Sequence, residues 1–536
     1  MPLDCLVINL TRFGDLLQSQ PLFHDLKSQG FKTGLLCLEN FAQTIPLLAK
    51  IDATWTLKGA HLLKTLKTNW QEGAIDLIKL AQEIRQTKPK YIINLTSTIA
   101  ARLLTKLIAD NSAQIIGFGL DGDGFGLNIG AWSTFLSGTS SCRQNSVFNI
   151  VDIFRSIGRT KLSKSTYQEL RGLNQPDASA LKALEEFLAQ NLAKLQITNP
   201  PQGYIAMQLG ASEERRMWPI AYFANLGDHL YKKHNLLPIL TGSGGEKKLA
   251  QKYQELAHEP YIDAIGSTSL PVLAALLTRV QLLISNDTGT MHLAAGLGTK
   301  SVGFFLATAQ PWDTGPYLKD CLCLEPDLPC HPCQFQKPCP NNYSCRYTIQ
   351  AEPVAQLISA YIQTGQWQPL QDDVPIRVWK TDLDQNNLAI VQALSKHSKA
   401  DRTLFILHQR NFWRQLLDAL EQEPETKKFE LPPCSEEFLG KILPVMQQVE
   451  NILPVLIEQG VLITQNKPTG KLFLRNCDRI QTLLSTNQHL LSLGQFWREL
   501  RTDLSQNLPE FLQALKLFQT NLSHLRHDLE LGTEYA

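Results

Sequence analysis

Short Val-, Ile- and Leu-rich runs alternate with helical patterns twice along this chain, and this rhythm limits its fold more than any other feature. The first series includes CLVINL, TGLLCL, YIINL and QIIGF, and the second includes YIAMQLG, LLPILTG, QLLISND and SVGFF. Apolar strands that alternate with helices are typical of parallel sheets covered on both faces. The sequence therefore predicts an α/β protein with two doubly wound, Rossmann-like sheets.

The domain boundaries follow from changes in composition. The first domain is predicted at residues 1–165, a helical linker at 166–201 and the second domain at 202–368. Pro200 and Pro201 end the linker because two successive prolines cannot continue a helix. Residues 369–536 are rich in Leu, Gln, Glu and Lys with helical spacing, which predicts an all-helical domain of unknown role. Ligands of doubly wound sheets bind beyond the carboxyl ends of the strands, so two facing sheets would enclose a substrate cleft.

Charge and hydropathy exclude several classes of protein. The chain of 536 residues has 51 Lys and Arg against 50 Asp and Glu, so no global basic excess favours nucleic acid as a partner. The first residues, MPLDCLVINL, lack the features of a secretory signal and predict a buried strand, so we expect a cytoplasmic protein. The apolar runs are too short to cross a bilayer, which leaves peripheral contact at the inner face of the membrane. An amphipathic C-terminal helix could make that contact, although a simple helical core is the favoured interpretation.

Three loops that follow predicted strands carry residues suited to chemistry. In the first domain, Gly14 permits a tight turn and Asp15 lies where the cleft should open, as either a reactive carboxylate or a helix N-cap. In the second domain, the loops at 210–219 (GASEERRMWP) and 285–292 (SNDTGTMH) offer backbone N–H groups and hydroxyls that could hold phosphate oxygens. Arg215 and Arg216 could add charge-assisted bonds to a diphosphate, or simply be solvated.

The order and spacing of several segments resemble those of glycosyltransferase family 9, the lipopolysaccharide heptosyltransferases. The segments are the three loops above, the longer stretch SNDTGTMHLAAGLGT and the WDTGPY motif at 312–317. The resemblance covers about residues 1–365. It implies a GT-B fold and an inverting transfer of a heptose or related sugar from an ADP-linked donor. The acceptor would be the lipopolysaccharide core or another cell-envelope glycan, free or lipid-linked.

The resemblance also assigns roles to individual residues. Asp15 matches the general base that takes a proton from the acceptor hydroxyl. Glu246 matches the residue that binds the ribose of the nucleotide. The remaining positions, which match residues around the diphosphate and the donor sugar, are Ser212, Arg216, Asp287, Thr288, Gly289 and His292.

Inverting displacement needs one base and positive potential at the leaving group, and no cofactor or metal ion for catalysis. The Asp121-Gly122-Asp123 segment resembles a metal-binding pair, but its glycine-rich surroundings favour a turn. Where the family has Gly-Thr-Pro and Phe-Gly-Pro-Thr, this chain has Gly298-Thr299-Lys300 and Phe305-Leu306-Ala307-Thr308. These departures fall beside the donor-sugar pocket that the family resemblance implies.

Two other functions remain open at this stage. A sugar-nucleotide epimerase of GT-B fold would use the same donor domain, and a non-catalytic scaffold would bind a sugar nucleotide without turnover. Residues at the end of the first domain could contact a charged acceptor, or could equally belong to a capped helix. They are Arg143, Asn145, Asn149 and Asp152.

A cysteine-rich loop occupies residues 321–345. Cys330, Cys333, Cys339 and Cys345 form a C-x2-C-x5-C-x5-C pattern. In a reducing compartment this spacing favours a structural zinc ion or iron–sulfur cluster over disulfides, with free thiols as the alternative.

Overall fold

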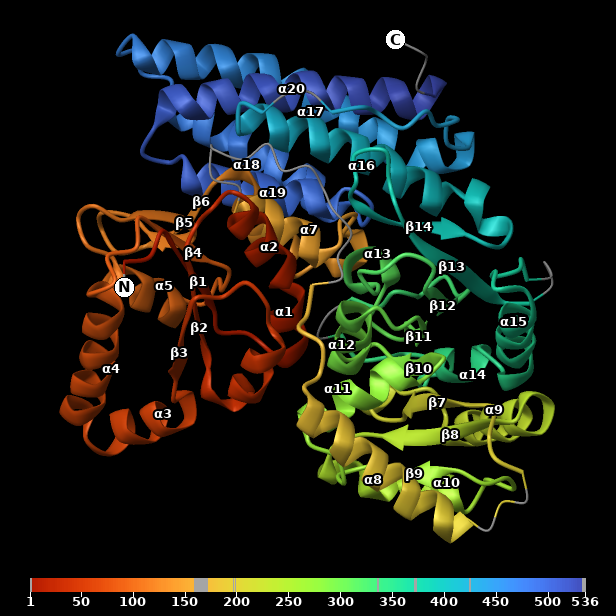
Figure 1. Ribbon diagram of the computed structural model, residues 1–536. Helices are drawn as coiled ribbons and strands as arrows, with labels where there is room; N and C mark the ends of the chain where they lie inside the picture. The colour runs from red at the N-terminus through yellow and green to blue at the C-terminus, as the bar shows by residue number, and fades with distance from the viewer. Residues whose placement is uncertain are drawn as a thin grey trace.

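Two α/β lobes lie side by side, and a layer of helices from the C-terminal part of the chain runs along both of them (Figure 1). The computed structural model describes residues 2–158, 172–195, 197, 199–334, 337–370, 374–423 and 426–532. Both sheets are doubly wound and the C-terminal region is helical, so the predicted fold class is confirmed. Part of the predicted linker, including residues 166–171, falls outside the described residues.

The first lobe is built on a six-stranded sheet of order β3-β2-β1-β4-β5-β6. Every neighbouring pair is parallel except β5 and β6, which form an antiparallel hairpin. β1 is buried along its whole length and β2 is buried except at Leu38, as their mainly apolar sequences predict. The strands are β1 (Cys5–Asn9), β2 (Thr33–Leu38), β3 (Ala53–Leu57), β4 (Tyr91–Asn94), β5 (Gln114–Leu120) and β6 (Gly126–Ile129).

Helices cover both faces of this sheet. One face is covered by α4 and α5, which pack on the apolar side chains of β1 and β4. The helices of the lobe are α1 (Phe13–Gln18), α2 (Gln20–Ser28), α3 (Gly59–Thr68), α4 (Trp70–Arg85), α5 (Ile99–Ile108), α6 (Ala131–Thr139) and α7 (Ile150–Ile157), with 3₁₀ turns η1 (Glu39–Leu47) and η2 (Arg143–Asn145).

The second lobe contains an eight-stranded sheet of order β14-β13-β12-β11-β10-β7-β8-β9. Six strands are parallel, and β13 and β14 extend the edge as an antiparallel pair. The strands are β7 (Gly203–Gln208), β8 (Leu236–Thr241), β9 (Ile262–Asp263), β10 (Leu282–Asn286), β11 (Ser301–Phe304), β12 (Leu322–Pro326), β13 (Ile376–Leu383) and β14 (Ala389–Ala393).

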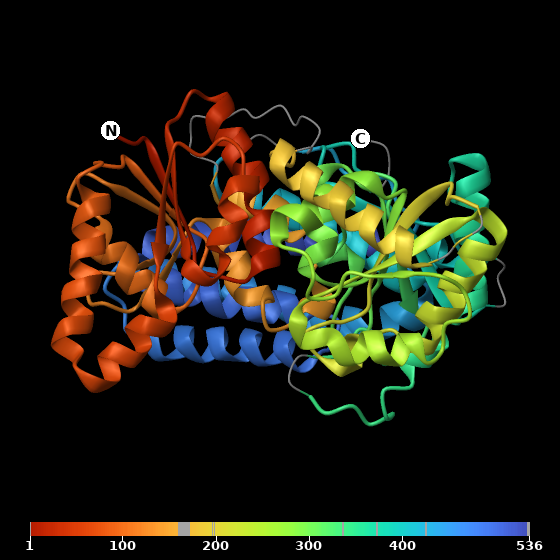
Figure 2. The ribbon, with the colours of Figure 1, turned by 60° about the horizontal axis from the view of Figure 1, so that its bottom comes forward.

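The helices of the second lobe lie on both faces of its sheet (Figure 2). The longest is α8, which belongs to the predicted linker and packs on α11. The set comprises α8 (Ala178–Leu195), α9 (Ile220–His234), α10 (Lys247–Gln254), α11 (Leu270–Arg279), α12 (Gly289–Leu297), α13 (Pro311–Thr314), α14 (Cys345–Thr348) and α15 (Ala351–Thr364), with 3₁₀ turns η3 (Glu214–Arg216) and η4 (Gly244–Glu246).

The helical region begins later than the sequence suggested. Residues 376–393, predicted to be helical, form β13 and β14 and complete the second sheet. Buried polar residues such as Arg377 on β13 hide the apolar pattern of a strand. The helices that follow are η5 (Lys396–Lys399), α16 (Asp401–Leu420), α17 (Glu436–Thr464), α18 (Gly470–Thr486), α19 (Leu491–Asp503) and α20 (Leu508–Leu531).

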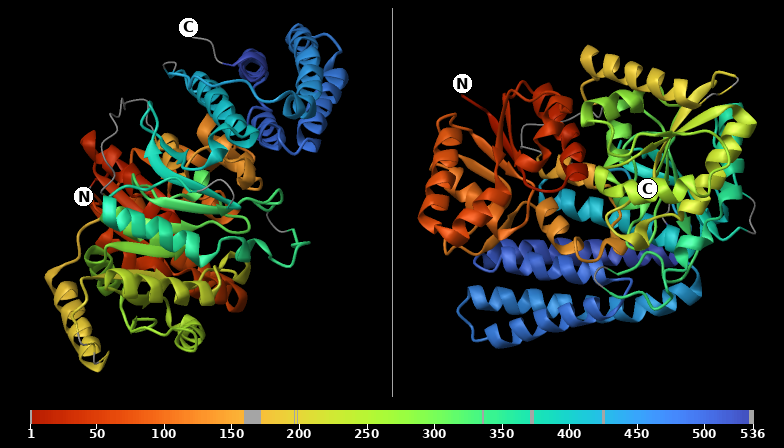
Figure 3. Two further views of the ribbon diagram at one scale, coloured as in Figure 1. Left: turned by 90° about the vertical axis from the view of Figure 1, so that its right-hand side faces the viewer. Right: turned by 90° about the horizontal axis from the view of Figure 1, so that it is seen from below.

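The C-terminal helices contact both lobes (Figures 1 and 3). On the first lobe, Asp503 of α19 accepts hydrogen bonds from the Asn128 backbone at 2.9 Å and the Thr134 hydroxyl at 2.8 Å. On the second lobe, Arg402 of α16 lies 3.5 Å from the buried Glu325 carboxylate of β12. One continuous apolar core runs through parts of both lobes and these helices. The helical layer is thus part of the folded body.

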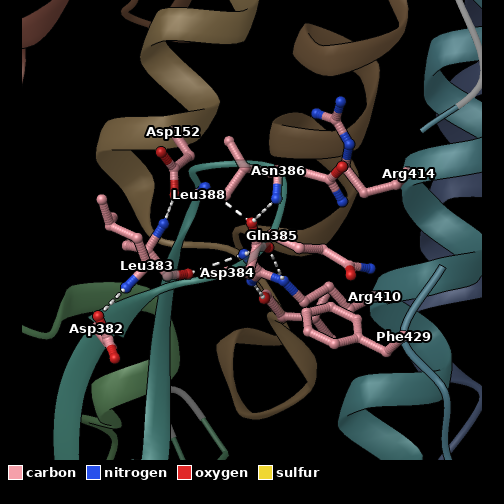
Figure 4. Close-up of polar contacts among 12 residues, drawn as sticks. Asp152, Asp382, Leu383, Asp384, Gln385, Asn386, Leu388, Arg410, Arg414 and Phe429 are labelled. Carbon is pink, nitrogen blue, oxygen red and sulfur yellow. Dashed lines mark hydrogen bonds and ion pairs between the residues drawn. The ribbon is translucent and has the colours of Figure 1, made fainter. Parts of the chain in front are cut away.

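Figure 4 shows the junction where all three parts meet. Arg410 of α16 pairs with Asp384, in the turn between β13 and β14, at 2.7 Å and donates a hydrogen bond to the Val147 carbonyl oxygen of the first lobe at 2.7 Å. Asp152 of α7 accepts a hydrogen bond of 2.8 Å from the backbone N–H of Ala389. These buried charges are paired, as burial requires. No helix in the described part of the chain has the length and apolarity to span a membrane.

Candidate active site

The two lobes meet where a loop from each sheet turns into a helix. A Cβ atom on Gly14 of α1 would lie 3.1 Å from Cδ2 of His292 and 3.4 Å from Cα of Gly289, both on α12. A Cβ atom on Gly289 would lie 2.3 Å from Cδ1 of Phe13. Glycine at both positions therefore allows the backbones to approach closely. The contact brings the carboxyl edges of the two sheets together.

Asp15 lies one residue beyond this contact. It is the third residue of α1, whose N-cap is Arg12, so the alternative that Asp15 is itself the N-cap is wrong. Among the described residues, its carboxylate accepts one long hydrogen bond, 3.4 Å from the Arg12 backbone nitrogen. The side chain is half-buried. A carboxylate with so little internal hydrogen bonding can accept a proton from a bound hydroxyl.

An ion pair between a half-buried arginine and a buried aspartate crosses between the lobes beside Asp15. Arg143, in η2 of the first lobe, lies 2.7 Å from the Asp313 carboxylate of α13 in the second lobe. Burial raises the pKa of Asp313, and the Arg143 charge opposes this shift. Attraction to Asp313 raises the pKa of Arg143, with smaller contributions from Asp287 and Asp15. Four charged residues from both lobes therefore share one electrostatic environment.

His292 lies inside this group. Burial lowers its pKa, and the Asp287 and Asp15 carboxylates oppose that shift. The imidazole is therefore neutral at pH 7. Its Nδ1 atom is buried and has no hydrogen-bond partner among the described residues. A buried polar atom left unsatisfied in this way is a candidate contact for a ligand.

The 210–219 loop places the Arg216 guanidinium beside the N-terminal end of α12. Arg216 pairs with the Asp287 carboxylate and donates a hydrogen bond of 3.0 Å to the Ser212 hydroxyl. Its buried Nε atom has no hydrogen-bond partner within the described residues. Thr288 is the N-cap of α12, and its hydroxyl lies 3.1 Å from that of Ser285. Hydroxyls, a guanidinium and a helix N-terminus together suit an anionic ligand.

Glu246 reaches back over the end of β7. Its carboxylate accepts hydrogen bonds from the Ser243 backbone nitrogen at 2.6 Å and from the Ser243 hydroxyl at 2.9 Å. Gln208 donates to its other oxygen at 3.3 Å. A Cβ atom on Gly210 would lie 1.5 Å from that same oxygen, so the carboxylate occupies space that any other residue at 210 would fill.

Two site residues were missed in the sequence. Gln208 accepts hydrogen bonds from Thr241 at 3.3 Å and Thr290 at 3.1 Å, which joins the ends of β7 and β8 to the first turn of α12. Asn286 donates to the Leu209 carbonyl oxygen at 2.9 Å and so anchors the 210–219 loop. Each is the polar last residue of an apolar strand. That pattern could have identified both.

The four candidate acceptor residues separate into different roles. Arg143 lies in the site, whereas Asn145 donates a hydrogen bond of 3.2 Å to the Gln488 carbonyl oxygen of the C-terminal region. Asn149 caps α7 through the Val151 nitrogen at 3.1 Å and donates to the Gly315 carbonyl oxygen at 2.9 Å. Asp152 is fully buried at the three-part junction. The last three therefore hold the lobes and helices together.

Four of the six cysteines at residues 321–345, those of the C-x2-C-x5-C-x5-C pattern, line one cavity of about 250 Å³ together with Arg215. Burial raises the pKa of the Cys333 thiol to about 11. Within the described part of the chain, no three or more His, Cys, Asp or Glu residues are arranged to hold a metal ion. Metal ligation by Cys330, Cys333, Cys339 and Cys345 therefore stays a prediction. Asp121 and Asp123 form a turn, in which the Asp121 carboxylate accepts from the Asp123 and Phe125 backbone nitrogens.

Two facing doubly wound lobes, with a carboxylate on one and an anion-binding helix terminus on the other, are the arrangement of the GT-B fold. Residues 78–343 match the family model described as glycosyltransferase family 9 (heptosyltransferase). This match lies within the two-lobed part of the chain, and both the predicted resemblance to family 9 and the prediction of a glycosyltransferase are confirmed. Asp15 precedes the matched residues.

Named relatives agree with this family. The chain is 24% identical to lipopolysaccharide heptosyltransferase 3 of Escherichia coli over 56% of its own length and 83% of that protein. It is 27% identical to lipooligosaccharide heptosyltransferase 2 of Campylobacter jejuni, but this match spans 30% of the chain and about half, 53%, of the relative. A family 9 glycosyl transferase from Veillonella parvula has the same fold, with a TM-score of 0.51, 19% identity, and coverage of 68% of this chain and 99% of that one.

Proposed function

We propose that this protein transfers a heptose or related sugar from an ADP-linked donor onto the lipopolysaccharide core or another cell-envelope glycan. The observation that carries the proposal is the meeting of Asp15, from the first lobe, with the Asp287–His292 loop of the second lobe across the Gly14–Gly289 contact. The relatives named as lipopolysaccharide heptosyltransferases support the choice of a heptose as the sugar and of lipopolysaccharide as the acceptor.

The reaction that we propose is a single inverting displacement without a metal ion. Asp15 takes the proton of the acceptor hydroxyl, and the hydroxyl oxygen forms a bond to the anomeric carbon. The bond from that carbon to the phosphate oxygen breaks, and the nucleoside diphosphate leaves with the electron pair. The leaving group gains negative charge, which Arg216 and the N-terminus of α12 would stabilise.

The other residues would bind the donor. Ser212 and Thr288 would donate hydroxyl hydrogen bonds to phosphate oxygens, and Gly289 would offer its backbone N–H at the helix terminus. The neutral His292 has an unsatisfied Nδ1, which would contact the donor sugar or diphosphate. Glu246 would accept hydrogen bonds from the ribose hydroxyls. Asp287 would hold Arg216 in position through their ion pair.

The proposed location follows from the acceptor. If the acceptor is a lipid-linked glycan, the enzyme works in the cytoplasm at the inner face of the cell membrane as a peripheral protein. The whole chain has a net charge of +1, so nucleic acid is not proposed as a partner.

The test is the turnover of an Asp15→Ala variant with ADP-heptose and core-oligosaccharide acceptors. Loss of a general base should lower kcat by about a hundredfold or more while the donor Kd stays nearly unchanged. Asp121→Ala is the matched control, because that carboxylate lies in a turn of the same lobe and should leave kcat unchanged. Full turnover in the Asp15 variant would refute the proposed role.

Two other functions would give different products. A sugar-nucleotide epimerase would change the donor sugar without releasing nucleotide, and a scaffold would bind donor without turnover on any acceptor. Release of free ADP that depends on the acceptor, with formation of a glycosidic bond, distinguishes the transferase from both.

A further inference from the structure

The outer layer of the first lobe exposes apolar side chains on three neighbouring helices. Among the described residues, sixteen large hydrophobic side chains are exposed, and eight of them fall between residues 63 and 125. Leu63 of α3 and Trp70 of α4 are each 64% exposed. The other members on these helices are Leu66, Ile75, Ile78, Ile99 and Leu103. We call these seven residues the outer apolar surface.

The packing of α4 and α5 explains why their exposed apolar side chains face outward together. Both helices bury one side against the sheet, with Ile84 of α4 and Leu104 of α5 in the same core cluster as Ile8 of β1. Side chains on the opposite sides of two adjacent helices must then face outward together. α3 and α4 lie at the end of the first lobe that is remote from the second lobe (Figures 1 and 2).

The same layer is strongly basic. From Lys58 to Ile108 the sequence has seven lysines and two arginines but three acidic residues, a net charge of +6, whereas the whole chain has a net charge of +1. Lys64, Lys67 and Lys106 are exposed and lie next to members of the outer apolar surface. The charge of this protein is therefore concentrated where its exposed apolar side chains are.

We propose that the outer apolar surface docks on an anionic phospholipid bilayer. Leucine, isoleucine and tryptophan side chains enter the headgroup region while the lysines contact lipid phosphates. A second copy of the chain does not fit this surface, because an isologous contact would bring two equally basic layers together. A bilayer instead supplies both the apolar environment and the opposite charge.

The surface is placed so that docking would orient the cleft. α3 follows the carboxyl end of β3 and α5 follows that of β4, so both begin at the sheet edge where Asp15 follows β1. Docking would thus fix the orientation of that sheet edge, on which the site also lies, relative to a membrane that holds a lipid-linked acceptor. This step rests on the proposed function, whereas the docking itself does not.

Vesicle sedimentation of the full chain tests the docking without donor or acceptor. We expect binding to phosphatidylcholine vesicles that contain about a third phosphatidylglycerol to be at least about tenfold tighter than to phosphatidylcholine alone, and to weaken as salt is added. Leu63→Ser with Trp70→Ser, and separately Lys64→Glu with Lys67→Glu, should each lower binding about tenfold or more. Leu472→Ser with Leu474→Ser is the matched control, since these α18 side chains are 51% and 54% exposed and should not matter.

Trp70 provides a second measurement. All nine tryptophans lie in the described part of the chain, and Trp70 is the exposed one, whereas the other eight are buried or half-buried. Brominated lipids quench indoles that enter the bilayer, so they should quench the wild-type fluorescence and leave the Trp70→Ser variant unquenched.

Three outcomes would overturn the proposal. Equal binding to neutral and anionic vesicles would remove the role of the lysines. An equal loss of binding in the α18 control would move the contact to the C-terminal helices. Self-association that the Leu63→Ser, Trp70→Ser variant abolishes would make a second copy the occupant. Since no sugar donor is present, none of these results depends on whether the transferase reaction occurs.

Discussion

Replacing Gly210 with alanine should weaken donor binding through Glu246 alone. The added Cβ would lie 1.5 Å from one oxygen of the Glu246 carboxylate and 2.6 Å from its carbon, which is far inside van der Waals contact. Because the Gly210 backbone is held by Asn286 at 3.2 Å, the carboxylate must move rather than the loop. Glu246 would then lose its position over the end of β7.

The size of the effect follows from the bonds that Glu246 makes. A charge-assisted hydrogen bond to the ribose is worth about 1.5–3 kcal/mol, so its loss should weaken ADP binding by roughly ten- to a hundredfold. The fold should tolerate the change, since the displaced carboxylate lies at the surface of the site. Isothermal titration with ADP gives the Kd, and thermal unfolding gives the stability of the same sample.

Gly244→Ala is the matched control. It lies in the same loop as Glu246, its backbone has no positive φ, and a Cβ there would meet nothing within 4 Å. We expect wild-type ADP affinity. If Gly210→Ala binds ADP as tightly as the wild type, or if the Gly244 variant loses as much affinity, the assignment of Glu246 to the ribose is refuted.

Two further predictions concern the attachment of the C-terminal helices. Glu325→Gln should lower the free energy of unfolding by about 3–5 kcal/mol, because the buried Arg377 and the half-buried Arg402 would lose the buried carboxylate that they share. Burial raises the pKa of Glu325, but the two arginines outweigh burial, and the pKa is lowered from its ordinary 4.5. The difference in unfolding free energy between wild type and variant should therefore be full above pH 4.5 and shrink as the pH falls below it. Urea unfolding at a series of pH values checks this, and a difference that stays constant with pH would contradict it. Gly138→Ala should lower the free energy of unfolding by about 1–3 kcal/mol, because its Cβ would lie 2.9 Å from the Phe496 backbone nitrogen. Gly440→Ala is the control, because a Cβ there would meet open space and should not destabilise the protein. Equal urea midpoints for the two variants would refute the close packing of α6 on α19.

The sequence was most informative where local chemistry determines structure. Asp15 and the 285–292 loop could be predicted because each follows an apolar strand directly, and parallel strands place such loops at one sheet edge. The contact between Gly14 and Gly289 could not be predicted, since it joins segments from two separate sheets. The same holds for the ion pair of Arg143 with Asp313, which depends on how the lobes are set against each other.

The strands β13 and β14 were missed for a different physical reason. Burial on both faces normally gives a strand an unbroken apolar run, but Arg377 and Thr381 of β13 are buried and polar. They are tolerated because Glu325 and the Cys321 backbone supply partners from β12. A pattern of hydropathy cannot register pairing across strands that lie more than fifty residues apart in the chain.

The C-terminal helices change what donor binding must cost. In a protein with two lobes joined by a linker alone, a ligand that contacts both lobes must also supply the free energy that orders them. Here α16 and α19 pack on different lobes within one continuous core, and the Arg143–Asp313 pair already closes the gap beside Asp15. The lobes are therefore ordered before the donor arrives. We therefore expect the donor to be admitted by local movement at the site rather than by rotation of a whole lobe.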